Sequence, residues 1–399
     1  MNPVYIVDSI RTPRARANQK GGLSKLNPYE LLDILYKDIK QKNFLDLHSI
    51  DEVILGCVTQ YGEQAGNIAK ASALYSDYPD SISGLTVNRF CSSSLDAINL
   101  AYLKVQSQQA DNVIAGGVEM MSRVPMLSDE AAIWNDIEIA ERAKIFLMGS
   151  GADLIASLFN ISRDDVDKQA LKSQQNALNA QKNNYFKSII PVTCTNKLIH
   201  CVADECIRPD TTLESLALLE PSFKRLGEKG VDQAQLNLFR NLKEISHVHT
   251  AGNSPAMADA ASMTLLSNKK IQENGHRARA KIISVATVND DPLLVLSGCI
   301  LATQKILLQN NLKVSDVDLF EIHEAFASTM IHCQEELKID DDKLNVNGGC
   351  IALGHPMGAT GSIMMSTLVD ELERQDLSTG IVATSGAAGA GTAILIERI

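Results

Sequence analysis

The chain has 399 residues, 45% hydrophobic and 21% charged, a composition typical of a packed globular protein with roughly two to three domains. Its formal net charge of −11 argues against general binding to nucleic acid or to an anionic membrane, because both need a basic face. The eight cysteines are irregularly spaced and no secretory signal accompanies them, so we expect free thiols in a reducing cytoplasm.

The stretch 377–396 is long enough and free enough of charge to be considered as a membrane span. Nine of its 20 residues are Gly, Ser or Thr, and glycines interrupt its β-branched residues. We therefore predict two buried strands around a glycine-rich turn and do not expect a membrane protein. The N-terminal segment has no basic leader and only a short apolar run, so we expect no signal peptide.

Strands and helices are predicted to alternate in the N-terminal part of the chain. Short apolar runs predict buried strands at 4–8, 53–58 and 113–116. Between the last two, apolar residues recur at helical spacing and predict a helix at 93–108. This strand–helix–strand order predicts a parallel sheet with helices on its faces.

The middle of the chain, residues 123–249, is richer in polar residues and shows mainly helical patterns, such as 162–182. We expect it to be an insertion that caps the first half. Within it, 231–242 is amphipathic and predicts a helix packed on the body, with a membrane or partner surface as the alternative.

The C-terminal third repeats the plan of the N-terminal part. Its predicted elements are strands at 282–288 and 317–322, a helix at 363–372, and closing strands at 381–384 and 392–396.

Spacing relates the two ends of the chain. Asp51 precedes Cys91 by 40 residues, and Asp318 precedes His355 by 37. In each case an acidic residue at a strand is followed by a motif before a long helix. This similarity favours a duplicated fold of two related halves.

The segment Asn88–Ile98 (NRFCSSSLDAI) places Cys91 directly before the predicted helix. The N–H groups and positive end of the helix would stabilise a thiolate there, as a nucleophile requires. Cysteine is also among the residues most often buried in a core, so a structural role is the alternative.

The segment Asn345–Ser362 (NVNGGCIALGHPMGATGS) surrounds His355 with glycines, which permit close backbone approach and unusual torsion angles. Pro356 suits the first turn of the next helix. A histidine held in such a turn is a candidate general base, with a structural histidine as the alternative.

Two further segments follow predicted strands. In Asp318–Ala327 (DLFEIHEAFA) a strand leads directly into His323 and Glu324, at the end where parallel sheets build sites; a capped helix start is the alternative. In Thr384–Ala393 (TSGAAGAGTA) the glycine spacing is G-x-x-G-x-G, the reverse of the G-x-G-x-x-G fingerprint of dinucleotide-binding loops. No βαβ unit can follow it, so we do not expect nucleotide binding of that type. A turn that presents backbone N–H groups to an oxyanion is favoured.

Metal-ligating residue types occur in the insertion without the spacing of a complete site. His247 and His249 alternate along an extended stretch and lack further ligands nearby. A second cluster offers one zinc-like spacing but no second spaced pair: Cys194, His200, Cys201 and Cys206. We therefore expect no metal.

Together these segments resemble the thiolase family over essentially the whole chain. The matching segments occur in the family's order: IRTP (10–13), NRFCSSS, AGGVEMMS (115–122), RPDTTLESLA (208–217), TAGNS (250–254), HEAFA, NVNGGCIALGHPMGATG and LIE (395–397).

The resemblance implies an α/β fold of two related βαβ-rich halves in a layered α/β/α/β/α arrangement. The N-terminal half would comprise residues 1–122 and 250–272, and the C-terminal half residues 273–399. Residues 123–249 would form an inserted loop domain that caps the coenzyme A site.

By resemblance, Cys91 is the nucleophile that takes the acyl group of an acyl-CoA as a thioester, and His355 accepts its proton. One oxyanion hole would use His355 and a water held by His323; the other would use the backbone N–H groups of Cys91 and Ala387. The H-E-A-F variant is closer to the fatty-acid-degrading and sterol-carrier-like branches than to the biosynthetic acetoacetyl branch.

The chain departs from the family pattern at the second active cysteine, since that position is Ser385. A serine hydroxyl titrates far above a thiol and needs a partner base. Carbon–carbon bond chemistry at Ser385 would therefore be slow, unless His323 or Cys350 moves the proton.

The coenzyme-binding segments also differ from the family. The coenzyme-contacting serine falls on a proline one place after Ser254, and the loop domain is lengthened around 224–247. Ser254, Lys224 and Arg225 are the candidate contacts to coenzyme A. The motif that lines the acyl pocket reads VLSGC at 295–299.

The resemblance implies an acyl-CoA C-acyltransferase that cleaves 3-ketoacyl-CoA by thiolysis or forms it by the reverse Claisen condensation. One alternative is a thiolase-fold enzyme limited to acyl exchange or hydrolysis, and another is a non-catalytic acyl-CoA-binding protein. We expect acyl-CoA and coenzyme A as substrates, no cofactor, and a cytoplasmic homodimer or homotetramer.

Overall fold

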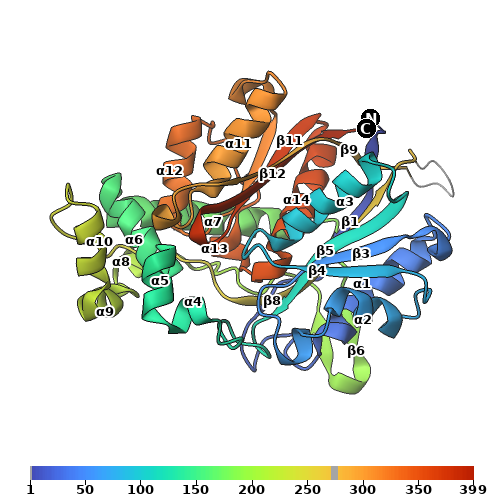
Figure 1. The fold of residues 1–399 in the computed structure, drawn as a ribbon, viewed down its shortest axis with the longest axis horizontal. Helices are drawn as coiled ribbons and strands as arrows, with labels where there is room; N and C mark the ends of the chain where they lie inside the picture. Colours follow the sequence, from blue (N-terminus) through green and yellow to red (C-terminus); the bar gives the residue numbers. More distant parts are fainter. Residues whose placement is uncertain (1, 271–276) are drawn as a thin grey trace.

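Strands from both ends of the chain join one ten-stranded sheet in the computed structural model, which describes residues 2–270 and 277–399 (Figure 1). The N-terminal strands are β1 (Val4–Arg11), β2 (Ala15–Arg16), β3 (Glu52–Gly56), β4 (Ser83–Val87), β5 (Asn112–Met120) and β8 (Ala258–Ser267). The C-terminal strands are β9 (Ala280–Asn289), β10 (Leu319–Ile322), β11 (Thr379–Ser385) and β12 (Ala390–Arg398). The expected domain boundary between residues 272 and 273 lies outside the described residues.

The sheet is mixed, not purely parallel as the order of elements predicted. Its path is β10-β11-β12-β9-β1-β8-β5-β3-β4, with β2 paired to β8. β3 pairs in parallel with β4 and β5, and β10 with β11, whereas the other pairs are antiparallel. The sequence pattern misses β8 because this strand is buried along its whole length and is rich in Ala and Ser.

Helices form the layers around and within this sheet. α1 (Pro28–Lys42) and α2 (Ile68–Tyr75) cover the N-terminal strands, and α11 (Gly298–Gln309) and α12 (Ala327–Leu337) cover the C-terminal ones. Between the two parts of the sheet lie α3 (Ser93–Gln106) and α14 (Thr360–Gln375), whose apolar side chains share one buried cluster with strands of both halves. The α/β/α/β/α arrangement that the resemblance implied is therefore confirmed.

Two aspartates support the interpretation of two related halves. Asp51, just before β3, accepts the N–H groups of Asp111 and Asn112 at the start of β5 (2.7 and 3.1 Å). Asp318, just before β10, accepts those of Ser378 and Thr379 at the start of β11 (3.0 and 2.8 Å). Each carboxylate thus links the start of one strand to the start of its parallel neighbour, at the equivalent place in each half.

The insertion is mainly helical, as predicted. It contains α4 (Ala132–Asn135), α5 (Ile137–Ala143), α6 (Met148–Leu158), α7 (Arg163–Lys182), β6 (Val192–Cys194), β7 (Ile199–Cys201), α8 (Leu213–Ala217), α9 (Lys224–Leu226) and α10 (Asp232–Leu238). It does not cap the first half alone, because α6 and α7 pack against α12 and α7 also packs against α13 (Cys350–Leu353). α10 is shorter than the predicted 231–242 helix, because it ends at Leu238, after which Phe239 leaves the helical torsion angles (φ −109°, ψ 70°).

The closing segment forms the predicted pair of buried strands, β11 and β12, around the turn 386–389. The segment 377–396 is therefore not a membrane span. No helix among the described residues combines the length and the hydropathy needed to cross a bilayer.

Candidate active site

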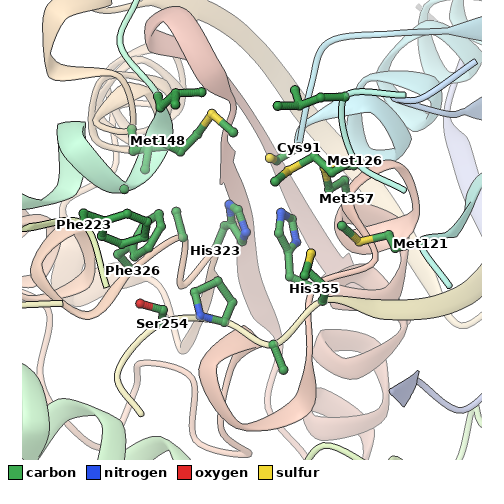
Figure 2. A pocket seen from close by; sticks show the side chains of 18 of the residues that line it. Cys91, Met121, Met126, Met148, Phe223, Ser254, His323, Phe326, His355 and Met357 are labelled. Carbon is green, nitrogen blue, oxygen red and sulfur yellow. The ribbon is translucent and has the colours of Figure 1, made fainter. Parts of the chain in front are cut away.

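Three side chains from distant parts of the sequence meet at one cavity: Cys91, His323 and His355 (Figure 2). The cavity, called here the first cavity, has a volume of about 290 Å³ and is otherwise lined mainly by Met, Leu and Phe side chains. A second cavity of about 260 Å³ adjoins it and shares five lining residues: Cys91, Met126, Leu127, Met148 and Met357. Cys91 therefore lies at the junction of two cavities.

The chain turns sharply before Cys91 and then enters α3. Phe90 has a φ of 49°, and Ser93 fixes the turn by donating its hydroxyl to the Phe90 carbonyl and accepting the N–H of Arg89. Burial raises the pKa of Cys91 to about 12, and the charge of Glu119 adds to this effect. Because the thiol is then protonated at neutral pH, it needs a base to become a nucleophile.

His355 lies in the turn between α13 and α14, and its backbone N–H donates to the backbone carbonyl of Ala256 (2.8 Å). Its Nδ1 lies 2.8 Å from the hydroxyl of Thr360, whose own hydrogen is donated to the Pro356 carbonyl. The Thr360 oxygen is therefore the acceptor, and Nδ1 carries the imidazole hydrogen. Nε2 is left with a free lone pair, as a general base requires.

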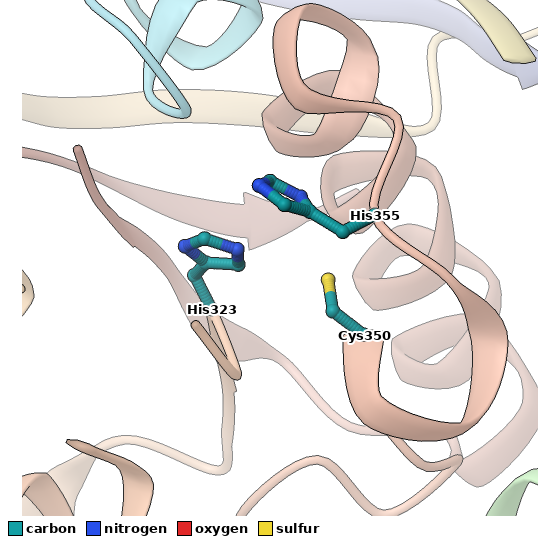
Figure 3. A group of neighbouring side chains, drawn as sticks. All are labelled: His323, Cys350 and His355. Atoms are coloured by element: carbon teal, nitrogen blue, oxygen red, sulfur yellow. The ribbon is translucent and has the colours of Figure 1, made fainter. Parts of the chain in front are cut away.

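His323 follows β10, with its Nδ1 3.1 Å from the backbone carbonyl of Ser385. A carbonyl only accepts, so Nδ1 carries the hydrogen here too, and the buried Nε2 has no hydrogen-bond partner in the described part of the chain. The two imidazole rings lie 4.5 Å apart between centroids (Figure 3). Burial lowers the pKa of His323 to about 4, and burial with the neighbouring His323 lowers the pKa of His355 well below its usual value, so both rings are neutral at pH 7.

The side chain of Ser385 lines neither of these cavities. It is fully buried and accepts the backbone N–H of Cys299 near the start of α11 (2.9 Å). Alternate residues of a strand point to the same face, and Ile381 and Ala383 in β11 pack in the apolar cluster formed with α11 and α12. The side chain of Ser385 therefore points toward these helices as well. In this geometry Ser385 acts on the site through its carbonyl, which orients His323, and its expected part in proton transfer stays a prediction.

The remaining residues expected at the site lie around the two cavities. Ala387 lines the second cavity with Cys91, as the predicted oxyanion turn requires. Ser254 lines the first cavity, and its hydroxyl is buried without a hydrogen-bond partner among residues 2–270 and 277–399. Lys224 and Arg225 are exposed on α9, between two residues that line this cavity: Phe223 and Leu226.

Three buried residues hold the site together, and of these the sequence analysis named only Glu324, as a polar residue after a strand. Glu119 accepts the N–H groups of Val58, Thr59 and Gly358, which ties the loop after β3 to the turn that carries His355. Glu324 accepts the Ile351 N–H and so holds α13. Thr360 sets the tautomer of His355. An acid inside an otherwise apolar, glycine-containing run (AGGVEMM, 115–121) was the available sequence signal for Glu119.

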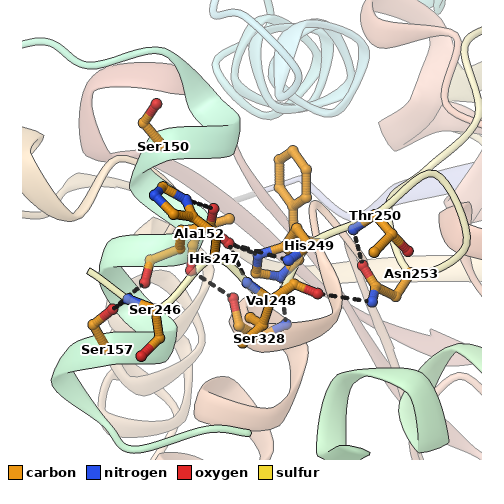
Figure 4. Close-up of polar contacts among 12 residues, drawn as sticks. Ser150, Ala152, Ser157, Ser246, His247, Val248, His249, Thr250, Asn253 and Ser328 are labelled. Atoms are coloured by element: carbon orange, nitrogen blue, oxygen red, sulfur yellow. Dashed lines mark hydrogen bonds and ion pairs between the residues drawn. The ribbon is translucent and has the colours of Figure 1, made fainter. Parts of the chain in front are cut away.

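His247 and His249, two histidines of the insertion, contact carboxylates and lie side by side in Figure 4. Asp153 on α6 contacts His247 Nδ1 through one oxygen (2.9 Å) and His249 Nδ1 through the other (2.6 Å). His247 Nε2 contacts Asp232 on α10 (3.0 Å). Across residues 2–270 and 277–399, neither these histidines nor the cysteines of the insertion belong to a group of three ligands close enough to share a cation.

Comparison with known proteins agrees with this fold and site. The family model of the thiolase N-terminal domain matches residues 4–270, and that of the thiolase C-terminal domain matches residues 276–398. A β-ketoadipyl-CoA thiolase of Pseudomonas knackmussii is 36% identical, with 99% of each chain covered. A 3-ketoacyl-CoA thiolase of Colwellia psychrerythraea is 37% identical over the whole of both chains. The crystal structure of the Bacillus anthracis acetyl-CoA acetyltransferase matches with a TM-score of 0.85 and 31% identity, over 100% of this chain and 99% of that one.

A layered α/β fold with a cysteine and two histidines at a shared cavity defines an enzyme of the acyltransferase class. The chain belongs to the thiolase family, and it is a thiolase.

Proposed function

We propose that this thiolase transfers acyl groups between coenzyme A thioesters through a thioester on Cys91. The observation that carries the proposal is the position of Cys91 at the junction of two cavities, beside a histidine whose Nε2 lone pair is free. One cavity can then hold the coenzyme arm and the other the acyl chain.

In the acylation step, His355 Nε2 takes the proton of the Cys91 thiol, and the sulfur attacks the thioester carbonyl carbon. The tetrahedral oxyanion is stabilised by backbone N–H groups at Cys91 and Ala387. When the intermediate collapses, the bond from carbon to the coenzyme sulfur breaks, and the leaving thiolate takes the proton back from His355.

The carbon–carbon step needs a group that moves a proton at the α-carbon of acetyl-CoA. We assign this role to His323, because its side chain lines the first cavity and its buried Nε2 has no hydrogen-bond partner among the described residues. A group with a pKa of about 4 is a weak base, so we expect this step to limit the rate of condensation.

The first cavity is the proposed channel of the coenzyme arm, since Ser254 lines it and Lys224 and Arg225 flank two of its lining residues. Cationic side chains there would pair with the phosphates of coenzyme A. Coenzyme A acts in this scheme as a substrate, and no step requires a metal or another cofactor. All eight cysteines are free thiols, which supports the proposed place in the cytoplasm.

The second cavity would then receive the acyl chain, and its lining favours an uncharged one. Its apolar walls include Trp134, Ile133 and Phe90. Among the described residues that line this cavity, Asp129 is the only charged one. Without a cation, a carboxylate at the end of the acyl chain would lose its hydration uncompensated. We therefore propose 3-ketoacyl-CoA with a plain hydrocarbon chain as the substrate class, in preference to a 3-ketodicarboxylyl-CoA.

A panel of substrates tests this preference. With coenzyme A present, kcat/KM for thiolysis of 3-ketohexanoyl-CoA is expected to exceed that for 3-ketoadipyl-CoA by at least roughly tenfold, since a buried unpaired charge costs more than 1.4 kcal/mol. Asp129→Lys should reduce the ratio of the two kcat/KM values, because it places a cation in the second cavity. Glu130→Lys, at the neighbouring exposed position, is the control and should leave this ratio unchanged. Equal rates with both substrates would contradict the proposed class.

Labelling tests the nucleophile. Acetyl-CoA should add one acetyl group to the wild-type chain in intact-mass analysis, and Cys91→Ala should abolish it because no other thiol lies at the junction of the cavities. Cys57→Ala, which removes another buried thiol, should label normally. Retained acetylation of Cys91→Ala would refute the assignment, and an unlabelled wild-type chain would favour a non-catalytic binding protein.

Acyl exchange or hydrolysis without carbon–carbon chemistry is the second candidate function, and the missing second cysteine favours it. It predicts normal acetylation of Cys91 together with no detectable cleavage of 3-ketoacyl-CoA. Measurable thiolysis that requires coenzyme A would exclude this candidate.

A further inference from the structure

Three potential metal ligands come together beside the cavity although they are separated in the sequence: His323, Cys350 and His355 (Figure 3). They lie after β10, at the first residue of α13, and in the turn before α14. One ligand atom from each residue lies within 4.8 Å of those from the other two. Among the residues that the structure describes, no other group of three or more His, Cys, Asp or Glu side chains lies close enough together to hold one ion.

The hydrogen bonds of the two histidines prepare them as ligands. Each ring donates its Nδ1 hydrogen to an oxygen fixed by the fold, the Ser385 carbonyl for His323 and the Thr360 hydroxyl for His355. Each Nε2 therefore keeps its lone pair, and the Nε2 of His323 is buried without a hydrogen-bond partner among the residues that the structure describes. Histidines that bind metals in proteins are oriented in this manner, by an acceptor at the second ring nitrogen.

Cys350 supplies a ligand of a different type. Its side chain is 2% exposed and lines neither cavity, so the proposed acyl transfer does not use it. Two imidazoles and a thiolate are a ligand set that Zn²⁺ accepts, with one tetrahedral position left open. The first cavity, which both histidines line, provides the space for that fourth ligand.

We propose that His323 Nε2, His355 Nε2 and Cys350 Sγ form a binding site for Zn²⁺ that reversibly inhibits the enzyme. On binding, the Cys350 thiol releases its proton to solvent, three coordinate bonds form, and a water completes the tetrahedron. Bond lengths of about 2.0–2.3 Å require ligand atoms roughly 3.3–3.8 Å apart, so the ligand atoms, which lie within 4.8 Å of one another, approach by at most about 1.5 Å. The ion occupies the lone pair of His355 that would otherwise accept the Cys91 proton.

Binding is tested on the full chain without substrate, after removal of metals by a chelator and with a phosphine reductant. Calorimetric titration with Zn²⁺ should show one ion per chain. Co²⁺ used as a probe should show the visible bands of a tetrahedral site and a thiolate-to-cobalt charge-transfer band. Cys350→Ala should lose that band and bind Zn²⁺ at least roughly tenfold more weakly, while Cys333→Ala, a buried thiol of the outer layer, should behave as wild type.

Inhibition is tested in a second measurement, and this part alone rests on the proposed function. Zn²⁺ should abolish acetylation of Cys91 in the wild type, chelation should restore it, and Cys350→Ala should require at least roughly tenfold more Zn²⁺. Without metal, Cys350→Ala should label like the wild type. Cys350→Ser, which preserves the volume, repeats the comparison if the alanine variant does not fold.

Two results would overturn the metal site: a charge-transfer band that survives in Cys350→Ala and Cys350→Ser, or unchanged Zn²⁺ affinity in both. A chain that binds Zn²⁺ as described but never becomes acetylated would instead refute the proposed function and leave the metal site standing.

Discussion

At the scale of residues, hydrogen bonds decide what each group of the site can do. The Ser385 carbonyl and the Thr360 hydroxyl place the hydrogens of both imidazoles on Nδ1, so both Nε2 atoms are acceptors. A neutral His323 can hold a water by accepting one of its hydrogens, and the other hydrogen of that water can reach a substrate oxygen. The sequence-based role of His323 in an oxyanion hole therefore requires a water.

Replacement of Ser385 tests whether this residue lies at the proton-transfer position. In Ser385→Cys we expect less than a threefold change in thiolysis, because the side chain faces α11 and not the cavities. We also expect a loss of about 1 kcal/mol in the free energy of unfolding, since sulfur accepts the Cys299 N–H poorly. Steady-state rates and denaturant titration measure the two effects.

Ser385→Ala is the matched control, because it also removes the acceptor of the Cys299 N–H. A gain of tenfold or more in carbon–carbon chemistry for Ser385→Cys alone would show that the thiol reaches the substrate. The assignment of the proton transfer to His323 would then be wrong.

At the scale of elements, one buried carboxylate holds the insertion together. Asp153 on α6 receives the N–H groups of Val248 and His249 as well as the two imidazoles, and His247 links it to Asp232 on α10. α10 follows α9, whose residue Leu226 lines the first cavity. The position of this wall of the cavity therefore depends on the contact of His247 with Asp232.

The pH should change the strength of that contact. Burial by itself lowers the pKa of His247, but hydrogen bonds and charges of Asp153 and Asp232 outweigh it and raise the pKa. A raised pKa means that the added stability is complete below about 6.5, the value of the unfolded chain, and is lost as pH rises through the folded value. His249, on the other oxygen of Asp153, is the third titratable group that faces this contact.

We expect His247→Gln to lower the free energy of unfolding by about 1–3 kcal/mol at pH 6 and by clearly less at pH 9. Denaturant titrations at the two pH values measure the difference from wild type. His200→Gln, at an exposed histidine of β7, should show no such difference. An equal loss at both pH values would mean that His247 acts only through packing.

At the scale of the whole molecule, the sheet ends in an uncovered strand. β4 is the last strand of the sheet, and Leu85 within it is 37% exposed. Exposed apolar side chains lie on adjoining helices, with Tyr75 on α2 and Leu103 on α3. A free edge with apolar neighbours is a surface that proteins usually cover, and a second copy of the chain would do so.

We therefore predict at least a homodimer formed through β4. Light scattering at micromolar concentration should give a mass of two or more chains of 43.3 kDa. Leu85→Lys should shift the mass toward one chain, whereas Leu308→Lys, at an exposed position on α11, should not. A wild-type mass near that of a single chain would contradict the prediction.

Local patterns in the sequence predicted alternating strands and helices and marked Cys91, His323 and His355 as candidates, whereas their roles and the layered arrangement came from the resemblance to thiolases. The three patterns are a cysteine before a periodic helix, a histidine after a buried strand, and a histidine in a glycine-rich turn. Such patterns are readable because helices and strands repeat every few residues and their ends are marked by turn-forming residues.

The tertiary structure decided the rest, because it depends on which strands pair and which face each side chain takes. Strand parity turned Ser385 away from the cavities, and the packing of α13 brought Cys350 beside His323 and His355. Antiparallel β8 joined the two parallel strand groups through β1, and no local pattern predicts such a pairing. Contacts between residues far apart in sequence follow from the whole packed core, whereas sequence periodicity reports only on neighbours.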